Sequence, residues 1–264
     1  MRGSVLKKPV LEAPVRLCCF PYAGGRAASF AGWQRRLRPV AEVIPVEYPG
    51  RGRRYGDRPI DSMSLLVADL ANELQPILSR RFVFFGHSMG ALVSFELTRE
   101  LRRRGMSQPD LLILSGARAP QTRDGEKKSR MTDKEFVEML KRHGATPPQV
   151  LSDEELLSCV LPILRSDFTA CEYSHNHEEP LNMNFTVFGG TEDDEVQLEH
   201  LQGWRVHTHR RTSVSLFPGN HFFVRQAETM VLDAVYREVL NLLRGDWEVR
   251  SGRPVELINS RVAT

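Results

Sequence analysis

The chain has 264 residues, and the 41% that are apolar suffice for the core of one large α/β domain. Its net charge of +3 is small and its basic clusters lack interleaved aromatic residues, so we expect no nucleic-acid partner. No segment approaches the ~18 apolar residues of a membrane span, and residues 1–17 lack the apolar core of a signal peptide, which favours a soluble, cytoplasmic protein without a membrane partner.

Six short apolar stretches are bounded by Gly, Pro or Asn, as is typical of strands buried on both faces: 15–20, 41–49, 82–86, 110–117, 184–190 and 213–219. Apolar residues at helical spacing lie between them, in 27–38, 61–80 (with Asp61 or Ser62 as the N-cap), 89–104 and 225–244. Strands that alternate with helices predict a mostly parallel sheet covered on both faces. We therefore expect a single α/β domain over residues 1–264.

Residues 121–180 interrupt this alternation. They include the helical stretches TDKEFVEMLKRHG and SDEELLSCVLPILRSDFTACEY but no strand, which predicts a helical insertion over the edge of the sheet. Residues 245–264 are polar and mixed in composition, and we expect them to form a loosely attached C-terminal extension.

The stretch FVFFGHSMGALVSFEL, residues 82–97, contains a serine between a predicted strand and a predicted helix. A chain that turns from strand to helix within two residues crowds its backbone, and Gly86 and Gly90 remove the side chains that would collide around Ser88. The pattern G-x-S-x-G in this context is typical of a nucleophile elbow, which exposes the serine hydroxyl.

A serine hydroxyl becomes a strong nucleophile when a histidine accepts its proton and a carboxylate orients that histidine. His221 follows the strand at 213–219, and Asp193 and Asp194 follow the strand at 184–190. The order Ser, Asp, His along the chain is the order of an α/β-hydrolase triad. All three sites come after strands of the same predicted sheet, so we expect them to lie together.

Acyl transfer also needs N–H donors that face the oxyanion of the tetrahedral intermediate. One donor is expected to be the backbone N–H of Met89, the residue after the nucleophile. The other is expected from the loop FPYAGG after the first strand, where the two glycines let the backbone approach a ligand closely. An ordinary turn is the alternative interpretation of that glycine pair.

The other histidines are expected to have structural roles. His87 is expected to pack or donate a hydrogen bond beside the serine. His175 and His177, and likewise His207 and His209, are spaced as metal-binding pairs, but no acidic or cysteine ligand completes either set. The four cysteines include no C-x-x-C, and so indicate neither a zinc site nor a disulfide framework.

Six motifs resemble those of type II thioesterases of polyketide synthases and nonribosomal peptide synthetases: CFPYAGG, YPGRGRR, FGHSMGA, LPILRSDF, FGGTEDDEV and FPGNHFF. The likeness covers residues 16–240 and implies the α/β-hydrolase fold. It implies Ser88 as nucleophile, Asp193 as orienting acid and His221 as base, with the backbones of Met89 and Ala23 as the oxyanion hole. The chain departs from the usual pattern at Asp194, where a proline commonly follows the catalytic aspartate.

By the same resemblance, the substrates are acyl groups held as thioesters on the phosphopantetheine arm of a carrier protein, and hydrolysis removes those that are stalled or wrongly loaded, an editing role. The resemblance also implies a lid role for residues 121–180. We expect a monomer that needs no cofactor and no metal. Carrier proteins of this kind are acidic, which makes Arg51, Arg53 and Arg54 candidates for their recognition, although solvated faces are the simpler interpretation of such clusters.

Three other functions stay open at this point. A triad with an oxyanion hole serves a general carboxylesterase or lipase equally well, and the related medium-chain fatty acyl thioesterases share the pattern. A noncatalytic module that recognises a synthase or a carrier protein would keep the fold, but it would have no reason to keep a complete triad.

Overall fold

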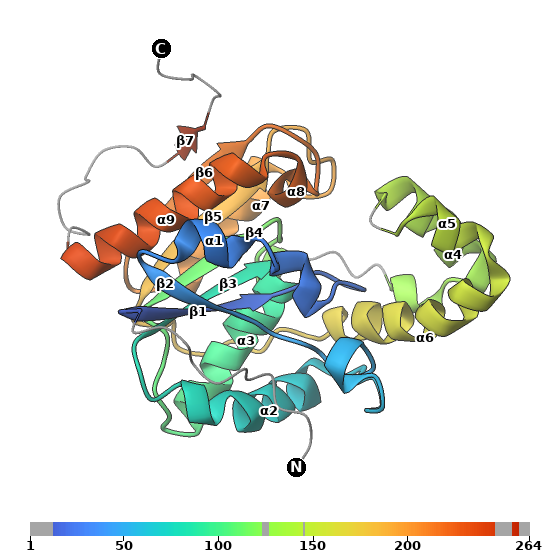
Figure 1. Ribbon diagram of the computed structural model, residues 1–264, viewed down its shortest axis with the longest axis horizontal. Coiled ribbons are helices and arrows are strands. Elements are labelled where there is room, and N and C mark those ends of the chain that lie inside the picture. The colour runs from blue at the N-terminus through green and yellow to red at the C-terminus, as the bar shows by residue number, and fades with distance from the viewer. Residues whose placement is uncertain (1–12, 123–126, 145, 246–254, 259–264) are drawn as a thin grey trace.

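The computed structural model describes residues 13–122, 127–144, 146–245 and 255–258. Within them a parallel sheet of seven strands has the order β2-β1-β3-β4-β5-β6-β7 (Figure 1). The strands are β1 (Val15–Phe20), β2 (Ala41–Pro45), β3 (Phe82–His87), β4 (Leu111–Ser115), β5 (Asn184–Gly190), β6 (Thr212–Phe217) and β7 (Val255–Leu257). The sheet confirms the predicted α/β-hydrolase fold class.

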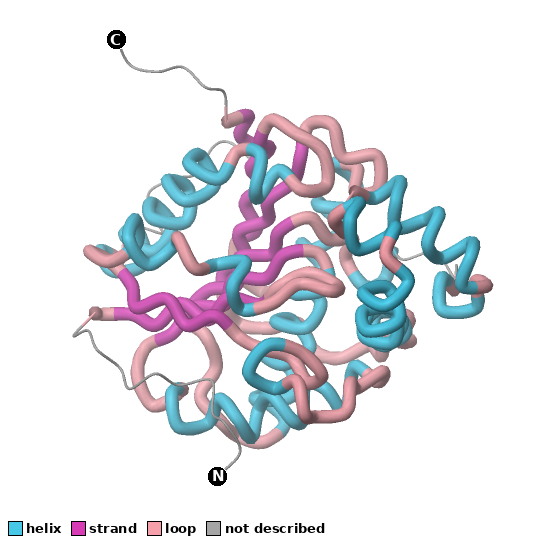
Figure 2. The backbone as a smooth tube through the Cα atoms, turned by 45° about the vertical axis from the view of Figure 1, so that its right-hand side comes forward, coloured by secondary structure: helices cyan, strands magenta, loops and turns pink. Residues whose placement is uncertain are grey.

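Helices lie on both faces of this sheet, as Figures 1 and 2 show. The α-helices are α1 (Trp33–Leu37), α2 (Met63–Leu74), α3 (Met89–Arg103), α4 (Asp133–His143), α5 (Pro148–Ser152), α6 (Glu154–Cys171), α7 (Leu198–Gln202), α8 (Phe223–Gln226) and α9 (Glu228–Arg244). One apolar cluster joins α2 and α3 to the sheet, and a second joins α1 and α9 to the opposite face.

The side chains of β3 alternate between the two faces of the sheet, which explains why the central strands are apolar throughout. Phe82 and Phe84 pack into the cluster with α2 and α3, while Val83 and Phe85 pack into the cluster with α1 and α9. Successive side chains of a strand point to opposite faces, so a strand covered on both sides needs an unbroken apolar run. All six residues of β3 are accordingly buried.

The predicted helix at 61–80 is shorter in the structure. It begins after Ser62, one of the two expected N-caps, and α2 ends at Leu74. A short 3₁₀ turn, Gln75–Ile77, follows it. Pro76 causes the break, because its ring removes a backbone donor and clashes with the preceding turn of an α-helix.

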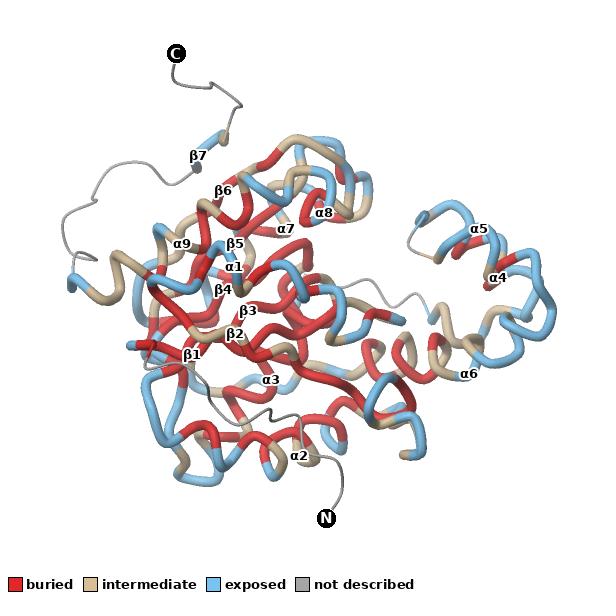
Figure 3. The backbone as a smooth tube through the Cα atoms, viewed as in Figure 1, coloured by how far each residue is buried: buried red, intermediate tan, exposed pale blue. Residues whose placement is uncertain are grey.

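The predicted helical insertion lies between β4 and β5 and contains α4, α5 and α6. A capping box between Thr132 and Glu135 begins α4, and Gly144 ends it in the left-handed conformation. These helices share their own apolar cluster, separate from the two that cover the sheet. In Figure 3, α4, α5 and the first half of α6 are largely exposed, whereas the second half of α6 is mostly buried or half-buried near the sheet.

Part of the predicted C-terminal extension, residues 246–254 and 259–264, lies outside the described residues, as do residues 1–12 at the other end of the chain. Residues 255–257 form β7, which pairs with β6 and was not predicted from the sequence. No helix among the described residues has both the length and the apolar character needed to cross a membrane.

Candidate active site

Ser88 lies on the turn between β3 and α3. Its φ of 54° makes it the only residue other than glycine with a positive φ in the described part of the chain. A side chain at Gly86 would collide with the backbone of Gly90, and one at Gly90 would collide with the carbonyl of Phe20. The two glycines therefore permit the tight turn that presents the Ser88 hydroxyl above the sheet.

His221 and Asp193 come from loops that follow β6 and β5. The Nε2 atom of His221 lies 3.0 Å from Ser88 Oγ, and its Nδ1 atom lies 2.9 Å from Asp193 Oδ2. The structure thus brings together the three residues predicted as a triad. Nδ1 can donate to the carboxylate while Nε2 accepts the serine proton, which is the arrangement a general base requires.

The Asp193 carboxylate is held in place by the turn it belongs to. Its Oδ1 atom accepts hydrogen bonds from the backbone N–H groups of Glu195 and Val196 at 2.9 and 3.0 Å. Its side chain is fully buried, whereas Asp194 is exposed. Because two backbone N–H groups hold Oδ1, the carboxylate keeps one orientation, in which Oδ2 faces His221.

A cleft of about 720 Å³ opens over these residues. Ser88, Asp193 and His221 line it from the sheet side, and Met139, Leu140 and Phe168 are among the lining residues from the helical insertion. Met89 and Ala23, the predicted oxyanion donors, line the same cleft. Met89 is the first residue of α3, where backbone N–H groups have no partner inside the helix.

His87 is buried beside this site. Its Nδ1 atom lies 2.9 Å from Ser115 Oγ, and its ring centroid is 5.5 Å from that of His221. Burial, reinforced by the nearby His221, lowers the pKa of His87 well below its ordinary value. His87 is therefore neutral and supports the site by packing and hydrogen bonding.

Two of the arginines expected on a carrier-binding surface are in ion pairs instead. Arg51 is only 5% exposed and forms a two-pronged ion pair with Asp167, with both N···O distances 2.6 Å. Arg54 is paired with carboxylates of its own loop and of α2, namely Asp57, Asp69 and Glu73. Of the three, Arg53 is the exposed one.

The Arg51–Asp167 pair joins the loop after β2 to helix α6. Burial alone would lower the pKa of Arg51, but the hydrogen bond and charge of Asp167 outweigh it and raise the pKa. Sequence analysis missed Asp167 as a residue of the site. Arg51 and Asp167 lie in separate motifs, YPGRGRR and LPILRSDF, and of the two only Arg51 was considered, as a surface residue for carrier recognition.

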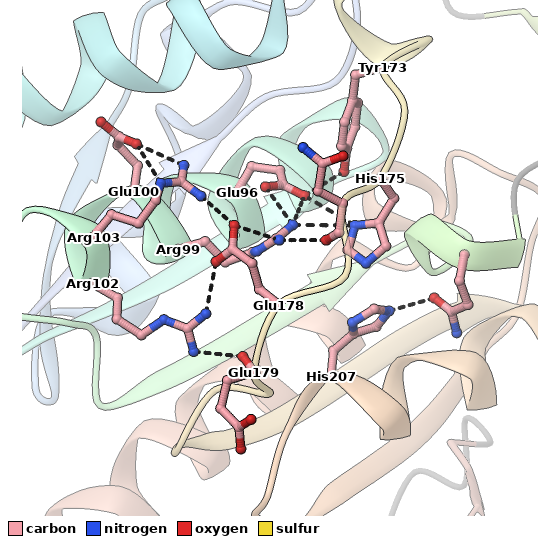
Figure 4. A network of polar contacts seen from close by, with 12 residues as sticks. Glu96, Arg99, Glu100, Arg102, Arg103, Tyr173, His175, Glu178, Glu179 and His207 are labelled. Carbon is pink, nitrogen blue, oxygen red and sulfur yellow. Dashed lines mark hydrogen bonds and ion pairs between the residues drawn. The ribbon is translucent and has the colours of Figure 1, made fainter.

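His175 and His207 belong to a polar network at the end of α3 (Figure 4). Arg99 bonds Glu96, the carbonyl of Asn176 and His175, and Glu178 bonds Arg102 and Arg103. The ring of His207 lies 4.9 Å from that of His175. In the ranges that the structure describes, no group of three or more His, Cys, Asp or Glu residues is placed to hold a metal ion. The network ties the segment after α6 to α3.

Comparison with known proteins agrees with this geometry. A sequence model of the thioesterase domain matches residues 15–240. Linear gramicidin dehydrogenase LgrE of Brevibacillus parabrevis is 38% identical over 249 residues, which cover 92% of this chain and 95% of that protein. The matched domain and the solved structures RedJ and YbtT are named as thioesterases and not as dehydrogenases.

Two solved structures have similar folds. RedJ, a thioesterase of the prodiginine pathway in Streptomyces coelicolor, is 35% identical with a TM-score of 0.81, over 86% of this chain and 91% of RedJ. YbtT, a type II thioesterase of the yersiniabactin NRPS/PKS pathway, is 30% identical with a TM-score of 0.79, over 89% of this chain and 97% of YbtT. By the domain match and these identities, the chain belongs to the thioesterase family.

Proposed function

We propose that this chain is a type II thioesterase, which hydrolyses acyl thioesters on the phosphopantetheine arm of carrier proteins serving a polyketide synthase or nonribosomal peptide synthetase. One observation carries the catalytic assignment: the hydrogen-bonded series Ser88, His221 and Asp193, with distances of 3.0 and 2.9 Å. YbtT, named as a type II thioesterase of an NRPS/PKS pathway, and RedJ, named as a thioesterase of the prodiginine pathway, support the choice of substrate class.

In the first half of the reaction Ser88 Oγ attacks the thioester carbonyl carbon while His221 Nε2 accepts the hydroxyl proton. Asp193 holds the tautomer of His221 that leaves Nε2 free to accept, and stabilises the imidazolium that forms. The backbone N–H groups of Met89 and Ala23 donate to the oxyanion. Collapse of the intermediate breaks the C–S bond, and His221 returns its proton to the departing sulfur.

In the second half a water molecule attacks the acyl ester on Ser88. His221 accepts a proton from that water, the same two N–H groups stabilise the second oxyanion, and His221 then protonates Ser88 Oγ as the C–O bond breaks. The products are a carboxylic acid and the free enzyme. A thiolate is a better leaving group than an alkoxide, so the first half is easier for a thioester than for an alkyl ester.

The insertion of α4, α5 and α6 is proposed as a lid over an acyl channel. Its apolar residues Met139, Leu140 and Phe168 line the cleft that contains Ser88. An acyl chain held against them would have its carbonyl at the serine and its sulfur toward the opening, where the carrier protein docks. Lids of this kind exclude water during the reaction and move to admit substrate.

One comparison of substrates tests this function. The protein is given an acyl-carrier thioester and a p-nitrophenyl ester of the same acyl chain, and kcat/KM is measured for both, with Ser88→Ala as the control for contaminating esterase. We expect the carrier thioester to have the higher kcat/KM. A higher value for the nitrophenyl ester would indicate a general carboxylesterase, and no turnover of either would indicate a binding module.

A further inference from the structure

Asp167, near the end of α6, contacts two loops that lead to the active site. Its carboxylate binds the Arg51 guanidinium through both oxygens, and its Oδ2 atom also accepts the backbone N–H of Gly24 at 2.7 Å. The Asp167 side chain is 3% exposed and that of Arg51 is 5% exposed. Because both partners are ionised, these bonds are shorter and stronger than neutral ones.

Gly24 directly follows Ala23, whose N–H is the proposed second oxyanion donor. The loop folds back at this point through a hydrogen bond from Gly25 N to Tyr22 O, and Gly24 has a φ of +75°. Arg51 Nη1 also approaches the carbonyl of Gly25 at 3.4 Å. The buried ion pair therefore holds the loop at two peptide groups, the one between Ala23 and Gly24 and the one between Gly25 and Arg26.

The consequence for Ala23 follows from the planarity of the peptide bond. The bond from Gly24 N–H to Asp167 fixes the plane of the peptide that joins Ala23 to Gly24. With that peptide held, the direction of the Ala23 N–H depends on two torsions only, the rotations about the Cα–C and N–Cα bonds of Ala23. The direction of the Ala23 N–H then depends on Asp167, whose own hydrogen bonds go to Arg51 and Gly24.

We propose that Asp167 and Arg51 are positioning residues for the second oxyanion donor, and that through Asp167 helix α6 of the insertion sets the geometry of the oxyanion hole. The proposal rests on the proposed function, because it takes Ala23 N–H to be that donor. Helix α6 then belongs to the insertion and also supports the active site, because its second half stays with the sheet when the rest of the insertion moves.

The test separates positioning from a structural role by comparing two inhibitors. A trifluoromethyl ketone with the alkyl chain of the substrate adds to Ser88 as a hemiketal and needs the oxyanion hole. An alkyl thioether of the same chain length on the carrier protein has no carbonyl at the reacting position and measures ground-state binding alone. We expect Asp167→Asn to weaken the ketone and kcat/KM by the same factor, about tenfold to a hundredfold, because loss of one whole oxyanion donor costs about 10²–10³. The dissociation constant of the thioether should change less than about threefold, because its contacts with the cleft do not involve the oxyanion hole.

A second variant guards against simple misfolding. Removing one partner of a buried ion pair strands the other charge, whereas replacing both by apolar residues is often neutral for stability. Arg51→Met combined with Asp167→Leu should therefore melt near the wild-type temperature and still lose ketone affinity, because no acceptor remains for Gly24 N–H. Equal ketone affinity in this folded double variant and the wild type would overturn the proposal.

The matched control is Asp133→Asn. Asp133 pairs with Arg165, also on α6, but contacts neither the cleft nor the Tyr22–Gly25 loop. It should leave both inhibitors unchanged, and a loss of ketone affinity equal to that of Asp167→Asn would show that any disturbance of α6 has this effect. Failure of the wild type itself to form the hemiketal, with Ser88→Ala as the blank, would contradict the proposed function rather than the role of Asp167.

Discussion

Asp193 Oδ2 lies 2.9 Å from His221 Nδ1, while Asp194, the next residue along the chain, is exposed. Asp193→Asn should therefore lower kcat by roughly a thousandfold or more, because an amide favours the wrong tautomer of His221 and cannot stabilise its imidazolium. Asp194→Asn should leave kcat close to the wild-type value. Steady-state kinetics on one acyl thioester measures both variants, and the opposite ranking would transfer the orienting role to Asp194.

Ser88 is the subject of a second prediction, which concerns stability as well as activity. Ser88→Ala and Ser88→Gly should both abolish turnover and labelling by a fluorophosphonate. The φ of 54° costs a non-glycine residue about 1–3 kcal/mol, and glycine pays about 0.4–1 kcal/mol in unfolded-chain entropy. Ser88→Gly should consequently be about 1 kcal/mol more stable than Ser88→Ala in denaturant unfolding. A Ser88→Gly variant that is about 0.4–1 kcal/mol less stable than Ser88→Ala, the entropy cost alone, would mean that the turn stores no strain.

The buried His207 predicts how stability depends on pH. Burial, with smaller contributions from the charges of His175 and Arg99, lowers its pKa to about 4. In the unfolded chain the pKa returns to about 6.5, so between these values the unfolded state binds more protons. The free energy of unfolding should then fall as the pH is lowered from 7 to 5, and the contribution of His207 should be lost on approaching pH 4. Urea unfolding at each pH measures this slope.

His207→Phe keeps a ring against Phe95 and Trp204 but cannot bind a proton. Its stability should depend less steeply on pH between 7 and 5 than that of the wild type, whereas His209→Gln, at an exposed position, should keep the wild-type slope. Identical slopes for the wild type and His207→Phe would show that protonation of His207 is not coupled to unfolding.

The amide hydrogens of the insertion should fall into two groups that exchange with solvent at different rates. Helices α4 and α5 pack mainly on the insertion's own small apolar cluster, so they can unfold locally while the sheet stays folded. The second half of α6 is held to the sheet side by the Asp167–Arg51 pair and should exchange more slowly. Hydrogen exchange read by mass spectrometry resolves the two parts. Protection of α4 equal to that of β3 would contradict a mobile lid.

Much of the fold could be predicted because its central strands are buried on both faces. The apolar runs at 15–20 and 184–190 match β1 and β5 at both ends. Helix α7, with five residues, and β7, with three, are too short to show a hydrophobic period, and neither was predicted. Sequence patterns therefore find long, buried elements more readily than short ones.

The residues of the candidate site could likewise be predicted only in part. Ser88, Asp193 and His221 could be located because each follows a recognisable strand, and parallel strands bring such loops to one edge of the sheet. Arg51 was expected on the surface, since arginine clusters are usually solvated. Its partner lies 116 residues away, and nothing local to either residue signals that distant charges will be buried together.

The separation of the three apolar clusters has a consequence for how such an enzyme diversifies. Met139 and Leu140 line the cleft but belong to the insertion's cluster, whereas the sheet is stabilised by the other two clusters. Substitutions that enlarge or shorten the cleft at these positions leave the packing around Ser88 and His221 unchanged. A few substitutions in the insertion can thus change which acyl group the cleft accepts, while the packing that stabilises the sheet and the loops of the triad stays the same.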